Sequence, residues 1–264
     1  EALVTDSWRH GLGQLAAVSG RKLHLSGGEP LLRRELLDII EHAVSLGLKT
    51  NLTTNGTLLD KEMARRLARS GIHAVSLSLD APSARLHDTI RGQEGAFRRT
   101  VRSLRWLRRF GAARSKPLRL RINTVVMRAN YRRLPEILRL AAELAVDDVV
   151  PMPIDESGES RQRLSGAQIA RYNRDIAPQV EELRRQHGFD LRPERIFPFG
   201  TDHNELRHAK RGGYARGRYL ASPCLAPWLH LFVAWDGRVY PCCMTVERVA
   251  PLGDVREQPL ADIL

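Results

Sequence analysis

The sequence has few cysteines, few lysines and no long apolar run. Its 264 residues contain three cysteines, too few for the disulfide framework of a small secreted protein. Cys224, Cys242 and Cys243 all lie near the C-terminal end, which favours a local metal or cluster site. No stretch of about 18 apolar residues occurs, so the sequence predicts no membrane span.

The positive charge comes mostly from arginine. Lysine and arginine number 42 against 30 aspartates and glutamates, giving a formal net charge of +12. Such a balance can indicate a nucleic-acid partner. The densest stretch, 98–116, carries apolar residues at helical spacing, as an amphipathic helix does. We interpret the arginines as solvated helix faces, which argues against a nucleic-acid partner, and an anionic partner is the alternative.

Short apolar runs alternate with helical patterns over the first 154 residues. We predict strands at 22–26, 48–56, 74–82, 118–126 and 147–154. We predict helices near 33–46, 60–70, 95–111 and 131–145, with Gly47 and Gly71 as C-terminal caps of two of them. This alternation indicates right-handed βαβ units and a parallel sheet, hence an α/β barrel or a doubly wound fold.

The rest of the chain changes character twice. A polar loop at 154–166 precedes a predicted helix at 165–187, and residues 188–222 show no clear periodicity and are interpreted as an irregular linker. From residue 223 onward, two apolar runs flank Asp236-Gly237, which predicts a β-hairpin with a tight primed turn. A small cysteine-bearing module therefore ends the sequence.

Polar and small residues follow the predicted strands. Ligands of parallel α/β sheets bind beyond the carboxyl ends of the strands, where glycines allow close approach and a carboxylate accepts hydrogen bonds from an ammonium group. Strand alternation places Ser76, Ser78 and Asp80 on one face, which suits a ribose-bearing ligand. Taken singly, each motif is also compatible with ordinary turn chemistry. The motifs are Gly27-Gly28-Glu29-Pro30, Thr53-Thr54-Asn55-Gly56, Ser76 to Asp80, and Asn123-Thr124.

The order LSGGEPLL, TTNGTLL, SLSLDAPSARLHDTIRG and INTVV resembles the radical S-adenosylmethionine (radical SAM) superfamily over about residues 20–150. The resemblance implies a partial (β/α)6 TIM-like barrel, in this chain without its first strand, and a 4Fe–4S cluster whose open iron chelates SAM. In that family, electron transfer cleaves SAM to methionine and a 5′-deoxyadenosyl radical, which abstracts a substrate hydrogen.

The same resemblance implies roles for individual residues. Gly27, Gly28 and Glu29 would face the methionine amino group of SAM. Arg91 would pair with the SAM carboxylate through two donors, or would instead cap a helix end. The remaining implied contacts are Thr54 and Asn55 near the SAM pocket, Ser78 and Asp80 near the methionine carboxylate or ribose, and Asn123 near the ribose.

The cysteine spacing is similar to the SPASM or twitch auxiliary-cluster domain. Cys224, Gly237 and Cys242 form a Cys-x12-Gly-x4-Cys pattern, and thiolates are preferred ligands of iron–sulfur clusters. Cys243 points away from Cys242 if the segment is extended, so it is the weakest of the three expected metal ligands. Zinc with His230 as an additional ligand, or free thiols, are the alternatives.

The Cys-x3-Cys-x2-Cys signature of the radical SAM family is not present in the sequence. We expect those cysteines and the first strand upstream of Glu1, and further auxiliary cysteines after Leu264. A cluster-free barrel that binds a peptide or nucleic acid is the alternative. A TIM-barrel lyase or isomerase is another, with Glu29 or Asp80 as general base.

The resulting hypothesis is that the chain is a fragment of a cytoplasmic radical SAM enzyme that modifies a peptide or small metabolite. It predicts a reductant such as ferredoxin or flavodoxin. Its parts would be the barrel at 1–187, a linker or substrate-side segment at 188–222 and the auxiliary domain at 223–264. Substrate contacts are expected within 154–222, with Asp155, Glu156, His203 and Arg218 as candidates.

Overall fold

The computed structural model describes residues 5–154, 160–213, 223–246 and 248–263. The candidates Asp155, Glu156 and Arg218 lie outside these residues. The chain divides into two compact units: residues 1–52, 70–73 and 223–264 form one, and residues 53–69 and 74–222 form the other.

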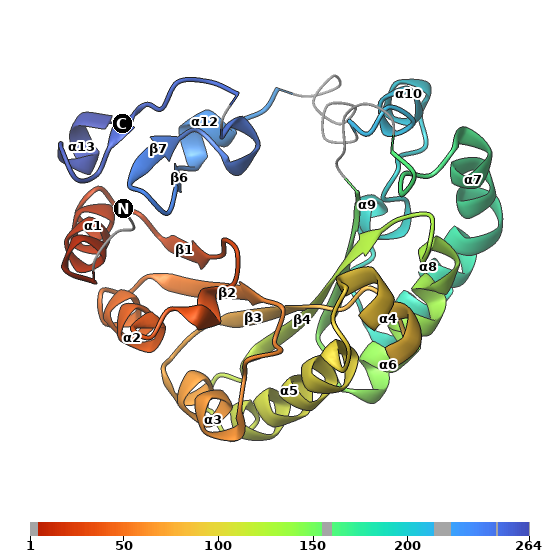
Figure 1. The fold of residues 1–264 in the computed structure, drawn as a ribbon, viewed down its shortest axis with the longest axis horizontal. Helices are drawn as coiled ribbons and strands as arrows, with labels where there is room; N and C mark the ends of the chain where they lie inside the picture. Colours follow the sequence, from red (N-terminus) through yellow and green to blue (C-terminus); the bar gives the residue numbers. More distant parts are fainter. Residues whose placement is uncertain (1–4, 155–159, 214–222, 247, 264) are drawn as a thin grey trace. The chain divides into compact units, whose positions relative to one another are not determined.

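Five strands form a sheet in the order β1-β2-β3-β4-β5 (Figure 1). The pairs β1–β2, β3–β4 and β4–β5 are parallel, so the predicted α/β class is confirmed. Each strand begins and ends within a few residues of its prediction. The strands are β1 (Lys22–Leu25), β2 (Lys49–Thr54), β3 (Ala74–Ser78), β4 (Arg119–Val126) and β5 (Asp148–Pro153).

Helices cover one face of the strands β3 to β5. Burial alternates along β4, where Leu120, Ile122 and Thr124 are buried and the residues between them are half-buried. Helix α5 (Ala96–Gly111) packs on β3 and β4, and α6 (Leu134–Glu143) packs on β5. On the opposite face, Ser78 of β3 and the polar residues Arg121 and Asn123 of β4 are half-buried.

The other helices of this unit follow the predicted pattern, with two differences. Helix α4 (Ala84–Arg91) was not predicted. The predicted helix at 165–187 is formed by α7 (Gly166–Arg171), a π-helical turn η3 (Tyr172–Ile176) and α8 (Ala177–His187). The predicted helices α3 (Lys61–Arg69) and α6 are present, and α6 is preceded by the short 3-10 helix η2 (Tyr131–Arg133).

The segment interpreted as an irregular linker contains helical structure, so that prediction was wrong for its described part. It forms α9 (Pro193–Ile196) and α10 (His203–Ala209). Asp202 and Glu205 make a reciprocal capping box at the start of α10, which offsets its short length by satisfying backbone N–H groups. His203, a substrate-contact candidate, is the first residue of this helix.

The unit that contains both ends of the chain has its own packing. Helix α1 (Thr5–Ala17) packs on α2 (Leu36–Ser45) and on α13 (Leu260–Ile263). The backbone N–H of Leu260 donates to Oε1 of Gln14 at 2.7 Å. The C-terminal segment therefore packs on the N-terminal helix of the same unit and is hydrogen-bonded to it.

The C-terminal module forms the predicted hairpin, although its turn differs. Only Gly237, with φ of 95°, has a positive φ angle in the turn. The Ala234 N–H donates to the Arg238 carbonyl, so the loop has three residues, not the predicted primed turn. A third strand extends the hairpin to an antiparallel sheet of β6 (Phe232–Val233), β7 (Arg238–Tyr240) and β8 (Gly253–Asp254), preceded by α12 (Ala226–Leu229).

None of the described helices combines the length and apolar character that a membrane crossing requires.

Candidate functional site

Ser78 and Asn123 are register partners on the neighbouring strands β3 and β4. Both are half-buried, whereas Leu77 and Ile122 beside them are fully buried. Because side chains of paired residues in parallel strands point to the same face, both lie on the face opposite the helices. The structure thus brings together two of the predicted site residues on the partly exposed side of the sheet.

Asp80 lies just beyond β3, and both of its carboxylate oxygens are engaged. Arg91 Nε lies 2.6 Å from Asp80 Oδ2, and the Val125 N–H donates to Asp80 Oδ1 at 2.9 Å. Burial raises the pKa of Asp80, and the positive charge of Arg91 and the Val125 N–H offset part of that rise. The side chain of Asp80 is 2% exposed and that of Arg91 is 31% exposed. Arg91 is therefore the member of this pair that reaches the surface.

His87 and Asn130 hold the backbone of Asp80, and neither was predicted from the sequence. The Asp80 N–H donates to Nδ1 of His87 at 3.1 Å. Burial, together with the charge of Arg91, lowers the pKa of His87 to about 4, so its ring is neutral at pH 7 and able to accept. Nδ2 of Asn130 donates to the carbonyls of Asp80 and Val125, both at 2.8 Å. In the sequence, the i,i+4 spacing of His87 and Arg91 indicates that the two residues share a helix face. No sequence pattern around Asn130 indicates that its side chain contacts Asp80.

Thr54 and Asn55 form a fixed turn after β2. Thr54 Oγ1 accepts from the Gly56 N–H at 3.0 Å, and Asn55 Oδ1 accepts from the N–H and hydroxyl of Thr57, both at 2.8 Å. Thr54 is 2% exposed. Thr53, its half-buried neighbour, takes the opposite face of the strand. Of the two threonines, Thr53 is the one on the partly exposed face.

Helix α5 anchors this turn. The Thr100 hydroxyl donates to the Asn55 carbonyl, and the Ser103 hydroxyl donates to the Gly56 carbonyl, each at 2.8 Å. The turn after β2 is therefore rigid on its helix side, and its geometry is preorganised for any ligand that contacts it.

Open space lies beside Gly27 and Gly28. A Cβ atom placed on either glycine would meet no heavy atom of the described residues within 4 Å. Gly27 has φ of 132°, a conformation that favours glycine. One oxygen of Glu29 accepts from the Leu31 N–H at 3.0 Å and caps η1 (Pro30–Leu32). The glycines thus leave room for a ligand to approach the backbone, as the resemblance implies.

The three cysteines are free thiols in the C-terminal unit. Cys242 is extended, but Cys243 begins the 3-10 helix η4 (Cys243–Thr245), so the segment is not extended throughout as assumed. Cys224 and Cys242 are half-buried and Cys243 is exposed. Partial burial of the thiol, with the neighbouring Cys242 thiol, raises the pKa of Cys243. The raised pKa makes the Cys243 thiol less ready than an ordinary thiol to become a thiolate ligand.

These thiols suit iron–sulfur chemistry by type, although they are fewer than the four ligands that a cluster usually takes. Within the described residues, no three His, Cys, Asp or Glu side chains are grouped as around a single metal ion. Among the described residues, this holds equally for the three cysteines alone and for the zinc alternative with His230.

The family model of the radical SAM superfamily matches residues 3–141, more than half of the chain. The chain belongs to the radical SAM superfamily. Residues 224–264 match the model of SPASM, an iron-sulfur cluster-binding domain, and this match begins at Cys224. Both parts of the sequence-based family prediction are therefore confirmed. Membership of these families implies SAM and 4Fe–4S clusters as cofactors.

Similar proteins are radical SAM enzymes of more than one kind. The chain is 29% identical to the AdoMet-dependent heme synthase of Methanosarcina barkeri, over 99% of this chain and 73% of that protein. It is also 29% identical to the PqqA peptide cyclase of Bradyrhizobium diazoefficiens, over 91% of this chain and 58% of the cyclase. The chain thus spans little more than half of that cyclase.

A solved structure agrees with the fold. Streptococcus suis SuiB matches with a TM-score of 0.73 and 19% identity, over 100% of this chain and 59% of SuiB. At that identity the likeness shows the radical SAM fold, with the small antiparallel sheet at its C-terminal end. The names of the two relatives show that enzymes similar to this chain include a heme synthase and a peptide cyclase.

Proposed function

We propose that the chain forms most of the SAM-binding barrel, and the beginning of the auxiliary domain, of a cytoplasmic radical SAM enzyme that acts on a peptide. The partly exposed polar face bearing Ser78 and Asn123 carries this proposal, because it lies on the side of the sheet that the helices leave uncovered. The expected parts remain the barrel at 1–187, a substrate-side segment at 188–222 and the auxiliary domain at 223–264.

When bound, the cluster and SAM would supply one-electron cleavage of the SAM sulfonium and the 5′-deoxyadenosyl radical that takes a hydrogen atom from substrate. The electron would come from a reductant of the ferredoxin or flavodoxin class. Gly28 leaves space for the methionine end of SAM, and the carboxylate of Glu29 suits its ammonium group. The hydroxyl of Ser78 and the amide of Asn123 suit the ribose.

Asp80 acts as a positioning residue in this proposal, not as a direct ligand. Its carboxylate is buried and holds Arg91 at 2.6 Å, which leaves the other guanidinium nitrogens of Arg91 as donors toward the SAM carboxylate. Asn55 shapes the turn after β2 through its own hydrogen bonds, and Thr54 supports that turn from the buried side. Thr53 joins the candidates for contact with SAM.

Cys224 and Cys242 would hold an auxiliary cluster together with further ligands, and Cys243 ranks below them. Support comes from the SPASM match that begins at Cys224 and from the half-buried state of both thiols. Partial burial limits the access of oxidants to thiolate ligands. Such protection suits an auxiliary cluster that accepts an electron or helps to bind the substrate.

A peptide substrate is supported by relatives that are named for peptide chemistry. The PqqA peptide cyclases are at 29% to 31% identity, and SuiB was solved with a precursor peptide, SuiA. A small metabolite is the second candidate for the substrate, because one relative is named as a heme synthase.

The test uses anaerobically reconstituted full-length protein with SAM and dithionite. We expect 5′-deoxyadenosine and methionine in equal amounts, and their absence would overturn the proposal. A peptide fraction from cells grown on deuterated medium should pass deuterium into 5′-deoxyadenosine. Protease treatment of that fraction should abolish the transfer, whereas transfer that resists protease would assign the substrate to small metabolites.

A further inference from the structure

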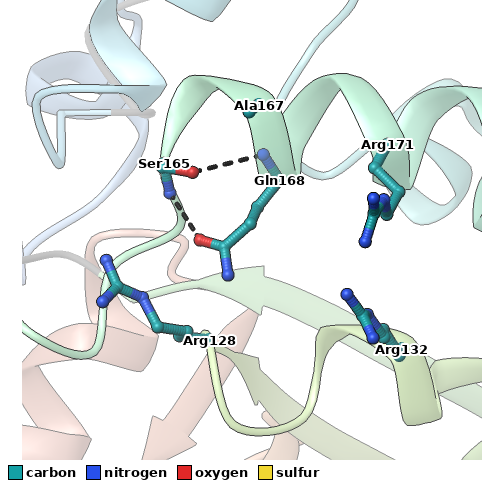
Figure 2. A pocket seen from close by; sticks show the side chains of 6 residues that line it. All are labelled: Arg128, Arg132, Ser165, Ala167, Gln168 and Arg171. Carbon is teal, nitrogen blue, oxygen red and sulfur yellow. Dashed lines mark hydrogen bonds between the residues drawn. The ribbon is translucent and has the colours of Figure 1, made fainter.

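Three arginines line one pocket that the sequence did not predict. Arg128 and Arg132 belong to the loop and short helix that follow β4, and Arg171 ends α7, which follows β5. The pocket has a volume of about 470 Å³. Figure 2 shows the guanidinium groups of Arg132 and Arg171 facing each other, with Arg128 below Gln168. The pocket is thus built where ligands of parallel sheets gather.

These arginines form no ion pair with another described residue, although the charge of Arg171 adds to the hydrogen bond from Arg174 in lowering the pKa of Asp175. None of the three has a carboxylate oxygen of a described residue within 4.0 Å. Asp175, one turn from Arg171, already pairs with Arg174 at 2.7 Å. Like charges around one pocket repel one another, so an anionic occupant would stabilise this arrangement.

The walls of the pocket are held in place. Ser165 and Gln168 hydrogen-bond to each other's backbone N–H groups in a capping box (Figure 2). Helix η2 packs against the π-helical turn η3. Asn130, which precedes η2, donates to the Asp80 carbonyl at 2.8 Å. The pocket therefore shares a fixed loop with the Asp80–Arg91 pair, which lies in the same unit.

We propose that Arg128, Arg132 and Arg171 bind carboxylate side chains of an acidic segment in the substrate peptide, an inference that rests on the proposed function. Guanidinium groups match carboxylates with paired donors, and the Gln168 amide adds a neutral one. No aromatic ring lines the pocket among the described residues, and the ring of Tyr131 is buried and lies under Arg132. Without a stacking platform, the site favours an acidic peptide over single-stranded nucleic acid.

The experiment measures fluorescence anisotropy of a labelled Gly-Glu-Glu-Glu-Gly peptide with the full-length protein at about 0.15 M salt, where nonspecific attraction is screened. We expect the Gln-containing counterpart not to bind. Arg132→Gln and Arg171→Gln should each weaken binding about tenfold, as expected for loss of a charge-assisted hydrogen bond. Arg133→Gln is the matched control, because Arg133 is exposed in the same short helix, pairs with Glu136 and does not line the pocket.

Equal losses in the control and the pocket variants would overturn the proposal in favour of a general basic surface. Tighter binding of an oligothymidylate of equal charge, lost in the same variants, would overturn it in favour of nucleic acid. Displacement by inorganic phosphate but not by glutarate would overturn it in favour of a phosphate site.

SAM cleavage without peptide should proceed at the wild-type rate in both pocket variants. If wild-type protein cleaves no SAM, the proposed function is wrong. The anisotropy result still shows whether the arginine pocket binds an acidic peptide.

Discussion

Arg91 Nε and Asp80 Oδ2 lie 2.6 Å apart, and the aspartate is the buried partner. The pair joins the end of α4 to the segment that follows β3, next to the face proposed for SAM. Through Asn130, the same aspartate is linked to the loop after β4. Asp80 thus joins two loops at the carboxyl ends of neighbouring strands, through its carboxylate on Arg91 and through its backbone carbonyl on Asn130.

We expect Asp80→Asn to lower the free energy of unfolding by about 1.5–3 kcal/mol, the range for hydrogen bonds to charged groups. The amide keeps an acceptor for the Val125 N–H but removes the charge that faces Arg91. Urea unfolding measures the change. Asp38→Asn, on an exposed position of α2, is the control and should change little. An Asp80→Asn protein as stable as the control would contradict the role assigned to the pair.

Stability should fall as the pH drops from about 6.5 to about 4, in part because of His87. The pKa of His87 is lowered to about 4 by burial and by Arg91, so in this range the unfolded chain binds a proton that the folded chain does not. The raised pKa of Asp80 acts in the opposite sense and offsets part of the loss.

Unfolding midpoints of wild type and His87→Asn between pH 4.5 and 7.5 isolate the histidine contribution. The asparagine retains an acceptor for the Asp80 N–H but does not titrate, so the variant should show the shallower decline in acid. Parallel curves for the two proteins would show that His87 already titrates normally in the folded state.

Gly28→Ala should weaken SAM binding about tenfold or more, with little change in the unfolding midpoint. The added methyl group meets no described atom within 4 Å but would occupy space assigned to the methionine end of SAM. Equilibrium dialysis with labelled SAM measures the affinity. Gly13→Ala, which also adds a methyl group in open space but on helix α1, should leave the affinity unchanged. Equal affinities in all three proteins would place SAM elsewhere.

Cys224→Ala and Cys242→Ala should each lower the iron and sulfide bound per protein after reconstitution, because each removes a thiolate ligand. Cys243→Ala should have a smaller effect, since partial burial of its thiol raises its pKa. Iron and sulfide analysis with the absorbance of the cluster measures all three. A loss confined to Cys243→Ala would reverse the proposed ranking of the ligands.

The sequence predicts the strands because each is a short apolar run bounded by turn residues. It missed α4 because only eight residues form it and tertiary contacts from Asp80 to His87 and Arg91 support it. The short helix α10 had a readable signal, the Asp202 and Glu205 capping pattern, that the lack of longer periodicity obscured.

Motifs carry the predicted positions of Gly28, Ser78 and Asn123 at the strand ends, and the contact of these residues with SAM stays a prediction. The family resemblance points to Thr54, whereas the burial pattern along β2, which the sequence does not show, leaves Thr53 more exposed than Thr54. The arginine pocket draws Arg128 from the loop after β4 and Arg171 from the end of α7, and only the folded chain brings them together.

The central claim is that the face bearing Asn123 receives SAM in a radical enzyme. Release of 5′-deoxyadenosine by reconstituted wild type, Asn123→Ala and Thr124→Val tests it most directly. Thr124 neighbours Asn123 but lies on the buried face and donates to the Leu79 carbonyl, so its variant should lose stability while folded protein keeps its rate. We predict release by wild type and Thr124→Val and at least about a tenfold loss in Asn123→Ala. No release by wild type, or equal release by all three proteins, would contradict the account.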